Sequence, residues 1–337
     1  MTKRDLKFDQ LRVCAIMFVV AHHVLLFGAD VCGYLTPFVP DDKGIAGVVL
    51  NSVVVTGVNL FVMISGWFGI RRVWKPMVRL VVECAMFGAV ALGMSLALWH
   101  ICPIDHVDGT WNWGRLWQSI KFTNWWFIVH YLMLVLAAPL LEAGMKNIEQ
   151  RTFERVLVAF LVLNFVFGFA WGYVNANGYN VVNFVMMYLL ARYMRLYPNT
   201  VANKIIFRHS IPIIIICAGI TALIFLADAP SHMPGHSSMA WHYNSPLVVL
   251  ESMAIFALFA RTKHVSRHVA LTAPYVLGIY LLQSSPNMVY YRNAVGSWLC
   301  GELGFAGIIP TIIVLFVICL AVSVVVTTVF KRLFKAL

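Results

Sequence analysis

The sequence predicts an all-α, polytopic integral membrane protein with about ten transmembrane helices and both termini in the cytoplasm. Of its 337 residues, 61% are hydrophobic and only 12% are Asp, Glu, Lys or Arg. Many segments reach the roughly eighteen apolar residues that a membrane-spanning helix requires. The basic residues gather in alternate loops, which is the pattern that orients a chain in a bilayer. No linker or low-complexity tract divides the chain, so residues 1–337 are expected to form a single transmembrane domain.

The predicted spans are apolar runs bounded by charged or turn-forming residues. In chain order they are 11–28, 45–69, 77–99, 124–142, 154–173, 180–195, 209–227, 245–260, 271–290 and 305–329. The first run is not expected to be a cleavable signal peptide, because it lacks a small-residue cleavage site and contains Arg12, His22 and His23. The sixth and eighth runs are short and are expected to be tilted or partly shielded by other helices.

The distribution of charge supports this topology. When the N-terminus is placed in the cytoplasm, the outer side receives only four of the 25 Lys and Arg residues, which are Lys43, Arg115, Lys121 and Arg292. This excess of positive charge on the inner side is the positive-inside pattern. The net charge of +11 therefore reflects membrane orientation, and it predicts the lipid bilayer rather than a nucleic acid as the partner.

The first span carries two ionisable residues on one face. Arg12 and His23 are eleven residues apart, which is close to three turns and about 16 Å of helix rise. His22 points about a quarter-turn away. Ionisable groups inside a membrane are costly and mark functional sites, and a neutral histidine can act as a general base. The competing interpretations are an orientation charge at Arg12 and a helix-packing histidine at His23.

The end of the second span combines small, polar and basic residues. Asn59 lies in the same run as Ser65-Gly66, a pair that would allow close helix approach. Four basic residues follow, which are Arg71, Arg72, Lys75 and Arg79. Guanidinium groups bind phosphates strongly, so this basic run is a candidate for binding a phosphorylated ligand from the cytoplasm. The alternative is that the run only orients the chain.

Two carboxylates and a pair of tryptophans complete the set of candidates. Glu83 in the third span is expected to pair with Arg79, four residues earlier on the same helix face. Glu251 in the eighth span has no basic residue nearby in the sequence, which makes it the stronger site candidate. Trp125 and Trp126 open the fourth span, where tryptophans usually form an interfacial aromatic belt.

The sequence predicts no bound metal and no bound cofactor. The seven cysteines form no CxxC pair, and those within apolar runs are expected to pack as small hydrophobes. A disulfide is possible between two of the three cysteines near outer helix ends, which are Cys32, Cys102 and Cys300. The histidines of the loop at 228–244 fit no helical zinc motif; they are His232, His236 and His242.

Four motifs occur in order from residue 8 to about residue 283. They are F-D-x-L-R at 8–12 with His23 beyond it; N-L-F-V-M-I-S-G-W at 59–67; W-W-F-I at 125–128 with Y-L at 131–132 and P-L-L at 139–141; and G-I-Y-L-L at 278–282. Together they resemble the membrane-bound acyltransferase-3 family of bacterial sugar and polysaccharide O-acetyltransferases. Two positions differ from the family pattern. Pro76 stands opposite Arg79 where the family often has R-x-x-R, and Gln283 stands where it commonly has histidine.

The resemblance implies a multi-pass enzyme of a bacterial plasma membrane. Such an enzyme moves an acyl group, usually acetyl, from cytoplasmic acyl-CoA to a hydroxyl of a glycan or lipid-linked sugar. Acetyl-CoA would be a donor substrate, bound by the basic run. His23 would deprotonate the acceptor hydroxyl or carry the acyl group transiently, and Arg12 would orient the site or bind phosphates. The candidates for the transfer path or acceptor site are Ser65, Asn59, Trp126 and Glu251.

The alternative function is a secondary transporter or glycan exporter that uses the same intramembrane charges as a relay. The ordered motifs favour the enzyme. Release of free CoA from acetyl-CoA would separate the two functions, because a transporter does not consume a thioester.

Overall fold

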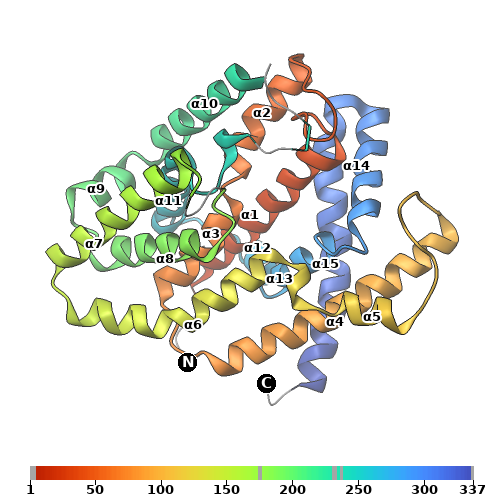
Figure 1. Cartoon of the computed structure of the whole chain (residues 1–337), viewed down its shortest axis with the longest axis horizontal. Coiled ribbons are helices and arrows are strands. Elements are labelled where there is room, and N and C mark those ends of the chain that lie inside the picture. Colours follow the sequence, from red (N-terminus) through yellow and green to blue (C-terminus); the bar gives the residue numbers. More distant parts are fainter. Residues whose placement is uncertain (1–4, 174–176, 230–233, 236–237, 335–337) are drawn as a thin grey trace.

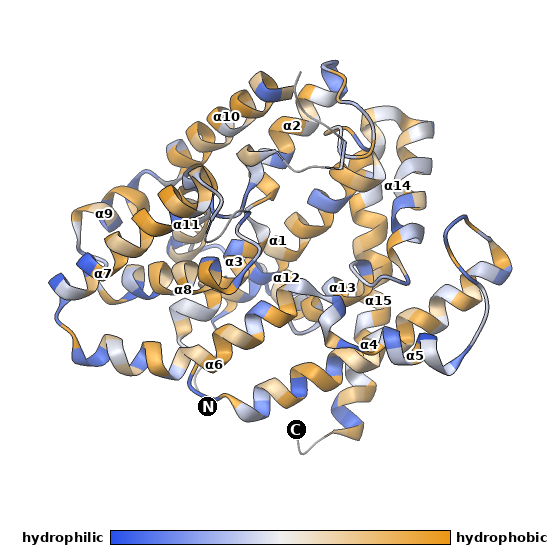
Figure 2. Ribbon diagram, in the orientation of Figure 1, coloured by the Kyte–Doolittle hydropathy of each residue, from blue (hydrophilic) through white to orange (hydrophobic). Residues whose placement is uncertain are grey.

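The computed structural model describes residues 5–173, 177–229, 234–235 and 238–334. Within these residues every regular element is a helix. Eight helical segments are long and apolar enough to cross a membrane. Most helices are hydrophobic along their length, and hydrophilic residues concentrate at helix ends and in loops (Figure 2). The prediction of an all-α integral membrane protein is confirmed.

The first half of the chain contributes four crossings and one short helix in a loop. Its helices are α1 (Leu6–His23), continued by a π-helical turn (Val24–Gly28); α2 (Asp42–Val54) and α3 (Gly57–Phe68), which together make one span; α4 (Trp74–Ile101); α5 (Trp113–Ser119); and α6 (Trp126–Asn147).

The second half contributes the remaining crossings. Its helices are α7 (Gln150–Val162), continued by a π-helical stretch (Leu163–Ala170); α8 (Val181–Leu196); α9 (Val201–Arg208); α10 (Ser210–Asp228); α11 (Pro246–Arg261); α12 (Arg267–Thr272); α13 (Val276–Gln283); α14 (Val289–Leu303); and α15 (Ile308–Leu333). Two of the ten predicted spans are not among the eight candidates. The predicted span 180–195 corresponds to α8, which has only 16 residues. The predicted span 271–290 is divided between short helices, and α14, which follows it, is joined with α15 in the last candidate span, Val289–Leu333.

Helix α1 lies in the middle of the bundle (Figure 1). It packs against α2, α3, α11, α12, α13 and α15, because apolar residues surround its circumference. Leu11, Ala15, Ile16 and Val20 are completely buried. The start of α1 and the end of α15 lie at the same, lower end of the bundle (Figure 1), which agrees with the expectation that both termini share one side of the membrane.

The predicted ninth span, 271–290, is interrupted in the structure. α13 ends at Gln283 and α14 begins at Val289. Pro286 lies in the intervening segment, where its missing N–H favours a helix break. Non-helical backbone at membrane depth is tolerated where protein buries it or where it lines a cavity. The break carries Arg292 into the first turn of α14, where it is only 6% exposed, so the prediction that Arg292 lies in an outer loop is wrong.

A cluster of polar side chains fixes the chain between α3 and α4. Tyr188 donates to Glu142 Oε1 at 2.6 Å, and Arg192 donates to Glu142 Oε2 at 2.7 Å. The Ile70 N–H donates to the Tyr188 hydroxyl at 2.9 Å. Gly69 has a positive φ of 75°, which is the conformation that glycine adopts most easily. These contacts determine the direction in which the basic run leaves α3.

Two further expectations concern side-chain pairing. Arg79 Nε donates to Glu83 Oε1 at 2.9 Å, so the predicted pair within α4 is confirmed. All seven cysteines are free, so no disulfide joins any two of Cys32, Cys102 and Cys300. The cohesion of the outer helix ends therefore depends on packing and hydrogen bonds.

The topology leads to a labelling prediction. In a cysteine-free background, Asp105→Cys should react with an impermeant maleimide added outside intact cells, because residue 105 lies in an exposed loop after α4. Asn147→Cys, at the end of α6 that is expected to face the cytoplasm, should react only after the membrane is permeabilised. Labelling of both positions is read by mass shift on a gel. The reverse pattern would show that the orientation is inverted.

Candidate functional site

Four cavities adjoin one another along α1. The inner cavity, of about 860 Å³, lies beside Arg12, and the neck, of about 250 Å³, shares Arg12 and Tyr131 with it. The histidine cavity, of about 250 Å³, shares Val19 and Tyr280 with the neck. The outer cavity, of about 590 Å³, shares His23 with the histidine cavity. Because consecutive cavities share wall residues, they form a row that follows α1 from Arg12 to His23.

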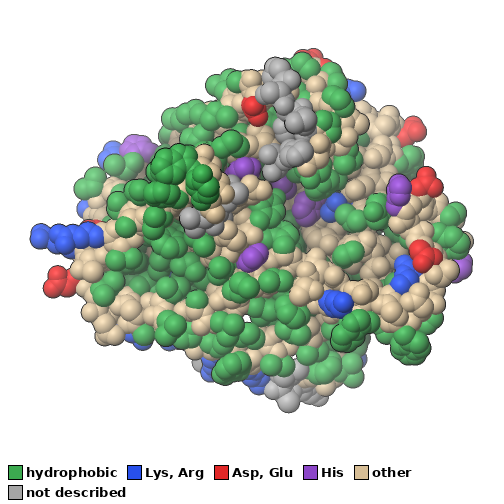
Figure 3. Space-filling model, in the orientation of Figure 1, with side chains coloured by type: hydrophobic (Ala, Val, Ile, Leu, Met, Phe, Trp, Pro, Cys, Tyr) green, Lys and Arg blue, Asp and Glu red, His purple; other side chains and the backbone are tan. Residues whose placement is uncertain are grey.

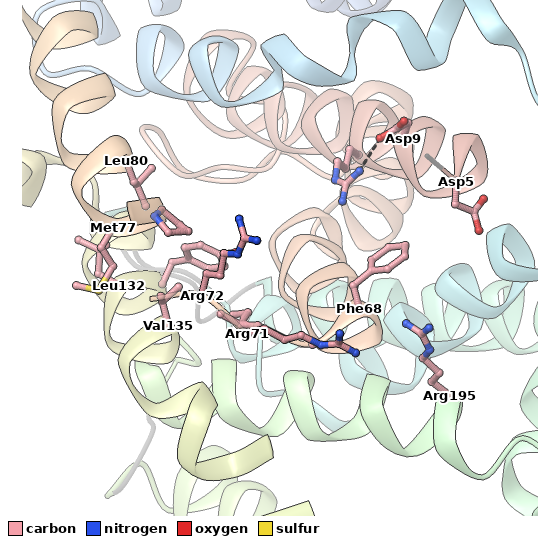
Figure 4. A pocket seen from close by; sticks show the side chains of 15 residues that line it. Asp5, Asp9, Phe68, Arg71, Arg72, Met77, Leu80, Leu132, Val135 and Arg195 are labelled. Atoms are coloured by element: carbon pink, nitrogen blue, oxygen red, sulfur yellow. Dashed lines mark hydrogen bonds and ion pairs between the residues drawn. The ribbon is translucent and has the colours of Figure 1, made fainter. Parts of the chain in front are cut away.

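The inner cavity is rich in guanidinium groups. Arg71 and Arg72 enter it from the segment after α3, and Arg195 enters it from the end of α8 (Figure 4). Arg12 completes the set and donates to Asp9 Oδ1 at 2.5 Å. Guanidinium groups therefore outnumber carboxylates in the cavity wall, which suits a ligand with several negative charges.

The structure brings only part of the predicted basic run to Arg12. Arg71 and Arg72 line the inner cavity, whereas Lys75 is exposed in the first turn of α4 and is not a wall residue. Arg79 is engaged by its ion pair within α4, and its guanidinium lies 5.5 Å from the centre of the Phe330 ring. The two arginines that precede α4 are therefore the members of the run placed to meet a ligand.

The neck is mostly apolar and has one polar pair. The Ser65 hydroxyl lies 3.0 Å from the Tyr131 hydroxyl, and aliphatic residues such as Val58 and Ile64 form most of the remaining wall. Gly66 packs against the backbone of Tyr188, where any Cβ would clash. Ser65 thus lines the neck, and the adjacent glycine lets α3 and α8 pack closely together.

The end of α13 holds the imidazole of His23. Its Nδ1 lies 2.8 Å from Gln283 Oε1. The Gln283 amide nitrogen donates to the Ser284 hydroxyl at 2.7 Å, and Arg292 Nη1 lies 3.4 Å from Oε1 as a further donor. Because an arginine nitrogen can only donate, the Gln283 oxygen that faces Arg292 is an acceptor. With Oε1 as the acceptor for His23 as well, Nδ1 carries the proton, and Arg292 Nη1 donates to Gln283 rather than to the ring. Nε2 then keeps its lone pair, which a general base requires.

Arg292 places a positive charge beside this histidine. Its Nη1 lies 3.3 Å from Nδ1 of His23 and donates to the Gln283 carbonyl at 3.0 Å. Its Nε and Nη2 donate to Asn293 Oδ1 at 3.0 and 2.8 Å, and its guanidinium lies 5.3 Å from the centre of the Phe27 ring. In the part of the chain that the structure describes, no carboxylate pairs with Arg292. Only neutral groups therefore contact this buried charge.

His22 has a different setting. Its Nδ1 lies 2.6 Å from Asn51 Oδ1 on α2, and both side chains are buried. The two histidine rings are 6.0 Å apart between centroids, and both line the histidine cavity. Because His22 is tied to the continuous helix α2, it has the environment of a packing histidine.

Aromatic rings wall the histidine and outer cavities. Trp126 lines both, with ring centroids 4.4 Å from Tyr179 and 5.8 Å from Tyr243. Asn59 lies behind this wall, where it donates to the Tyr243 carbonyl at 2.9 Å and accepts from Asn183 at 3.1 Å. Histidine side chains and a basic side chain are visible in a hollow on one face of the molecule (Figure 3). Trp126 is therefore placed to touch a ligand, and Asn59 is placed to support the wall.

Glu251 lies apart from the four cavities, whereas one of the loop histidines lines the outer cavity. Glu251 is completely buried in α11, lines none of the four cavities, and has no hydrogen-bond partner among the described residues. His242 lines the outer cavity, whereas His232 and His236 lie outside the described residues. No cluster of three metal-ligating side chains occurs within the described ranges. The structure thus does not bring Glu251 to His23.

Several wall residues were not anticipated from the sequence. They are Tyr131, Tyr179, Tyr243, Arg195 and Arg292. Aromatic residues are abundant in the spans, so nothing distinguished Tyr179 and Tyr243, whereas Tyr131 belongs to the Y-L motif at 131–132 but was given no role. A signal did exist for Arg292, because Pro286 breaks an apolar run shortly before it.

Comparison with known proteins adds one match. The profile of the acyltransferase-3 family, described as an acyltransferase domain, matches residues 5–330. No curated protein and no solved structure matches the chain. The matched range covers nearly the whole chain and includes α1, α3, α6 and α13, which carry the four motifs. The chain therefore belongs to the acyltransferase-3 family.

Proposed function

We propose that this membrane acyltransferase is an O-acetyltransferase of a bacterial plasma membrane. It moves acetyl from cytoplasmic acetyl-CoA to a hydroxyl of a glycan or lipid-linked sugar. The observation that carries the proposal is the row of cavities from the arginine-rich inner cavity to His23. This row connects a site suited to a polyanionic donor with a membrane-buried base.

The shape of the donor matches the first two cavities. The phosphates of CoA would bind the guanidinium groups of Arg12, Arg71 and Arg72 in the inner cavity. The thioester arm of CoA is long, narrow and uncharged, which matches the apolar neck beyond Arg12. About 16 Å of helix rise separates Arg12 from His23, so an extended arm would carry the thioester toward the histidine cavity.

The proposed reaction uses Nε2 of His23. Nε2 removes the proton from the acceptor hydroxyl as the hydroxyl oxygen attacks the thioester carbonyl carbon. The tetrahedral intermediate collapses with cleavage of the C–S bond, and the CoA thiolate takes the proton from the imidazole. Gln283 holds Nδ1–H throughout, so only Nε2 exchanges the proton. The products are an acetyl ester and free CoA.

The acceptor would occupy the histidine and outer cavities. The outer cavity, of about 590 Å³, lies within the usual size range of ligand sites. Trp126 and Tyr179 offer flat apolar surfaces for a sugar ring, and Asn177 and His242 offer polar groups for its hydroxyls. This combination favours an uncharged, polyhydroxylated ring as the group that receives acetyl.

A transporter or glycan exporter would also place cavities across the membrane, so the decisive experiment measures chemistry. Purified protein in proteoliposomes is given acetyl-CoA and a glycan acceptor, and free thiol is measured. Thiol release that depends on the acceptor, with acetyl found on the glycan by mass spectrometry, supports the enzyme. Passage of glycan without thiol release would support the transporter.

The first prediction for catalysis concerns the two histidines. His23→Ala should lower the rate of acetyl transfer by about 100-fold or more, because it removes the general base. His22→Ala should lower it by less than about tenfold, because His22 contacts Asn51 and not α13. Initial rates are compared with size-exclusion profiles that check folding. A dead His22 variant together with an active His23 variant would assign the base to His22.

The second prediction concerns Gln283. Gln283→Leu removes the acceptor for Nδ1–H of His23, so kcat should fall by about tenfold to 100-fold while the Michaelis constant for acetyl-CoA changes little. Gln283→Glu keeps an acceptor oxygen and should retain more activity. Gln118→Leu, at an exposed position of α5, is the matched control. An unchanged kcat in the leucine variant would mean that Gln283 does not orient His23.

The third prediction tests whether a basic residue of the run must line the inner cavity to affect donor binding, or whether its charge alone is sufficient. Arg72→Ala should raise the Michaelis constant for acetyl-CoA by about tenfold, because a charge-assisted contact to phosphate is lost from the inner cavity. Lys75→Ala, which removes an equal charge outside the cavity, should change it by less than about twofold. Arg72→Lys should rescue binding only partly. Equal effects of the two alanine variants would contradict a localised donor site.

A further inference from the structure

An apolar groove lies on the other side of Arg292 from the histidine cavity. This lateral groove has a volume of about 630 Å³ and is formed by α4, α13, α14 and α15. Its wall includes Met94, Leu98, Trp298 and Ile318. Trp298 is 65% exposed and Ile318 is 48% exposed, and both belong to membrane-spanning helices. The groove therefore opens toward the hydrocarbon of the bilayer.

Among the described residues, Arg292 is the one charged residue in the wall of the lateral groove, and it also lines the histidine cavity. A buried guanidinium without a carboxylate partner is expensive in a membrane protein. Its hydrogen-bond acceptors are the neutral groups of Gln283 and Asn293, which use four of its five N–H groups. The site thus combines the apolar lateral groove with a buried positive charge at the end next to His23, which no carboxylate among the described residues neutralises. These two features are complementary to an amphiphile that carries an anionic group.

The depth of His23 determines what kind of amphiphile fits. About 16 Å of helix rise separates His23 from Arg12 at the membrane border, in a hydrocarbon layer about 30 Å thick. A sugar attached to a lipid through phosphate reaches this depth only if the phosphate enters as well. Arg292 offers a positive charge at that position, 3.3 Å from the His23 ring. A two-chain phospholipid, whose headgroup remains at the border, does not meet this requirement.

We propose that the lateral groove binds the hydrocarbon chain of an isoprenyl phosphate-linked sugar. The phosphate lies at Arg292, and the sugar lies in the histidine and outer cavities. This inference rests on the proposed function, which it deepens by naming the lipid of the acceptor and the groove that holds it. The chain enters from the bilayer between α4 and α15, while the acetyl donor enters from the inner cavity, so the two substrates meet at His23 from different sides.

The test measures binding and does not depend on catalysis. Detergent-purified protein is titrated with a long-chain isoprenyl phosphate, with the isoprenol of equal chain length, and with phosphatidylglycerol, and complexes are quantified by native mass spectrometry. The isoprenyl phosphate should bind at least about tenfold more tightly than the isoprenol, because a charge-assisted contact to Arg292 is gained. Phosphatidylglycerol should not displace it at equal concentration. Equal binding of phosphate and alcohol, or ready displacement by phosphatidylglycerol, would overturn the proposal.

Matched variants locate the site. Ala97→Trp fills the lateral groove from α4 and should weaken isoprenyl phosphate binding by about tenfold or more. Ala159→Trp, on an exposed position of α7 away from the groove, should leave it unchanged. Arg292→Gln should abolish the preference for phosphate over alcohol, and Arg292→Lys should keep part of it. Undiminished binding in Ala97→Trp would place the lipid elsewhere.

Activity separates this inference from the proposed function. Acetyl transfer to a water-soluble sugar together with absent isoprenyl phosphate binding would overturn the lipid site and leave the transferase intact. Tight, Arg292-dependent binding without any thiol release would support the lipid site and overturn the acetyltransferase.

Discussion

The hydrogen bond between His23 and Gln283 is the contact on which the rest of the site depends. It joins residues 260 positions apart at 2.8 Å, and it fixes both the orientation of the imidazole and the nitrogen that carries the proton. A straight ninth helix would not end at Gln283. The interruption between α13 and α14 therefore shapes the site directly, because it allows a side chain at the end of α13 to meet a histidine at the end of α1.

The same interruption explains how Arg292 is accommodated. The last carbonyl of α13 belongs to Gln283, and Arg292 donates to it at 3.0 Å. Carbonyl groups at the C-terminal end of a helix carry partial negative charge and favour a nearby cation. Arg292 thus satisfies the backbone that the break exposes, and the break in turn offsets part of the cost of the buried guanidinium.

Hydropathy and charge were sufficient to predict the fold, because a membrane demands long apolar helices and the basic loops report their orientation. Helical periodicity was also sufficient to place Arg12 and His23 at two ends of one row of cavities. The partners of His23 could not be predicted in the same way. Gln283 and Arg292 approach it through a local break whose course depends on surrounding helices. Burial alone was a poor guide, because Glu251 is completely buried and lies outside the cavities.

The divided ninth crossing also has a consequence for biosynthesis. α13 has 8 residues and α14 has 15, so neither half reaches the roughly 20 residues that insert stably as an independent segment. α15 packs against α14 and against α13. The packing around His23 is therefore completed when α14 and α15 are inserted beside α1. A partly synthesised chain that lacks α14 therefore lacks Arg292 and the contacts that it makes with His23 and Gln283.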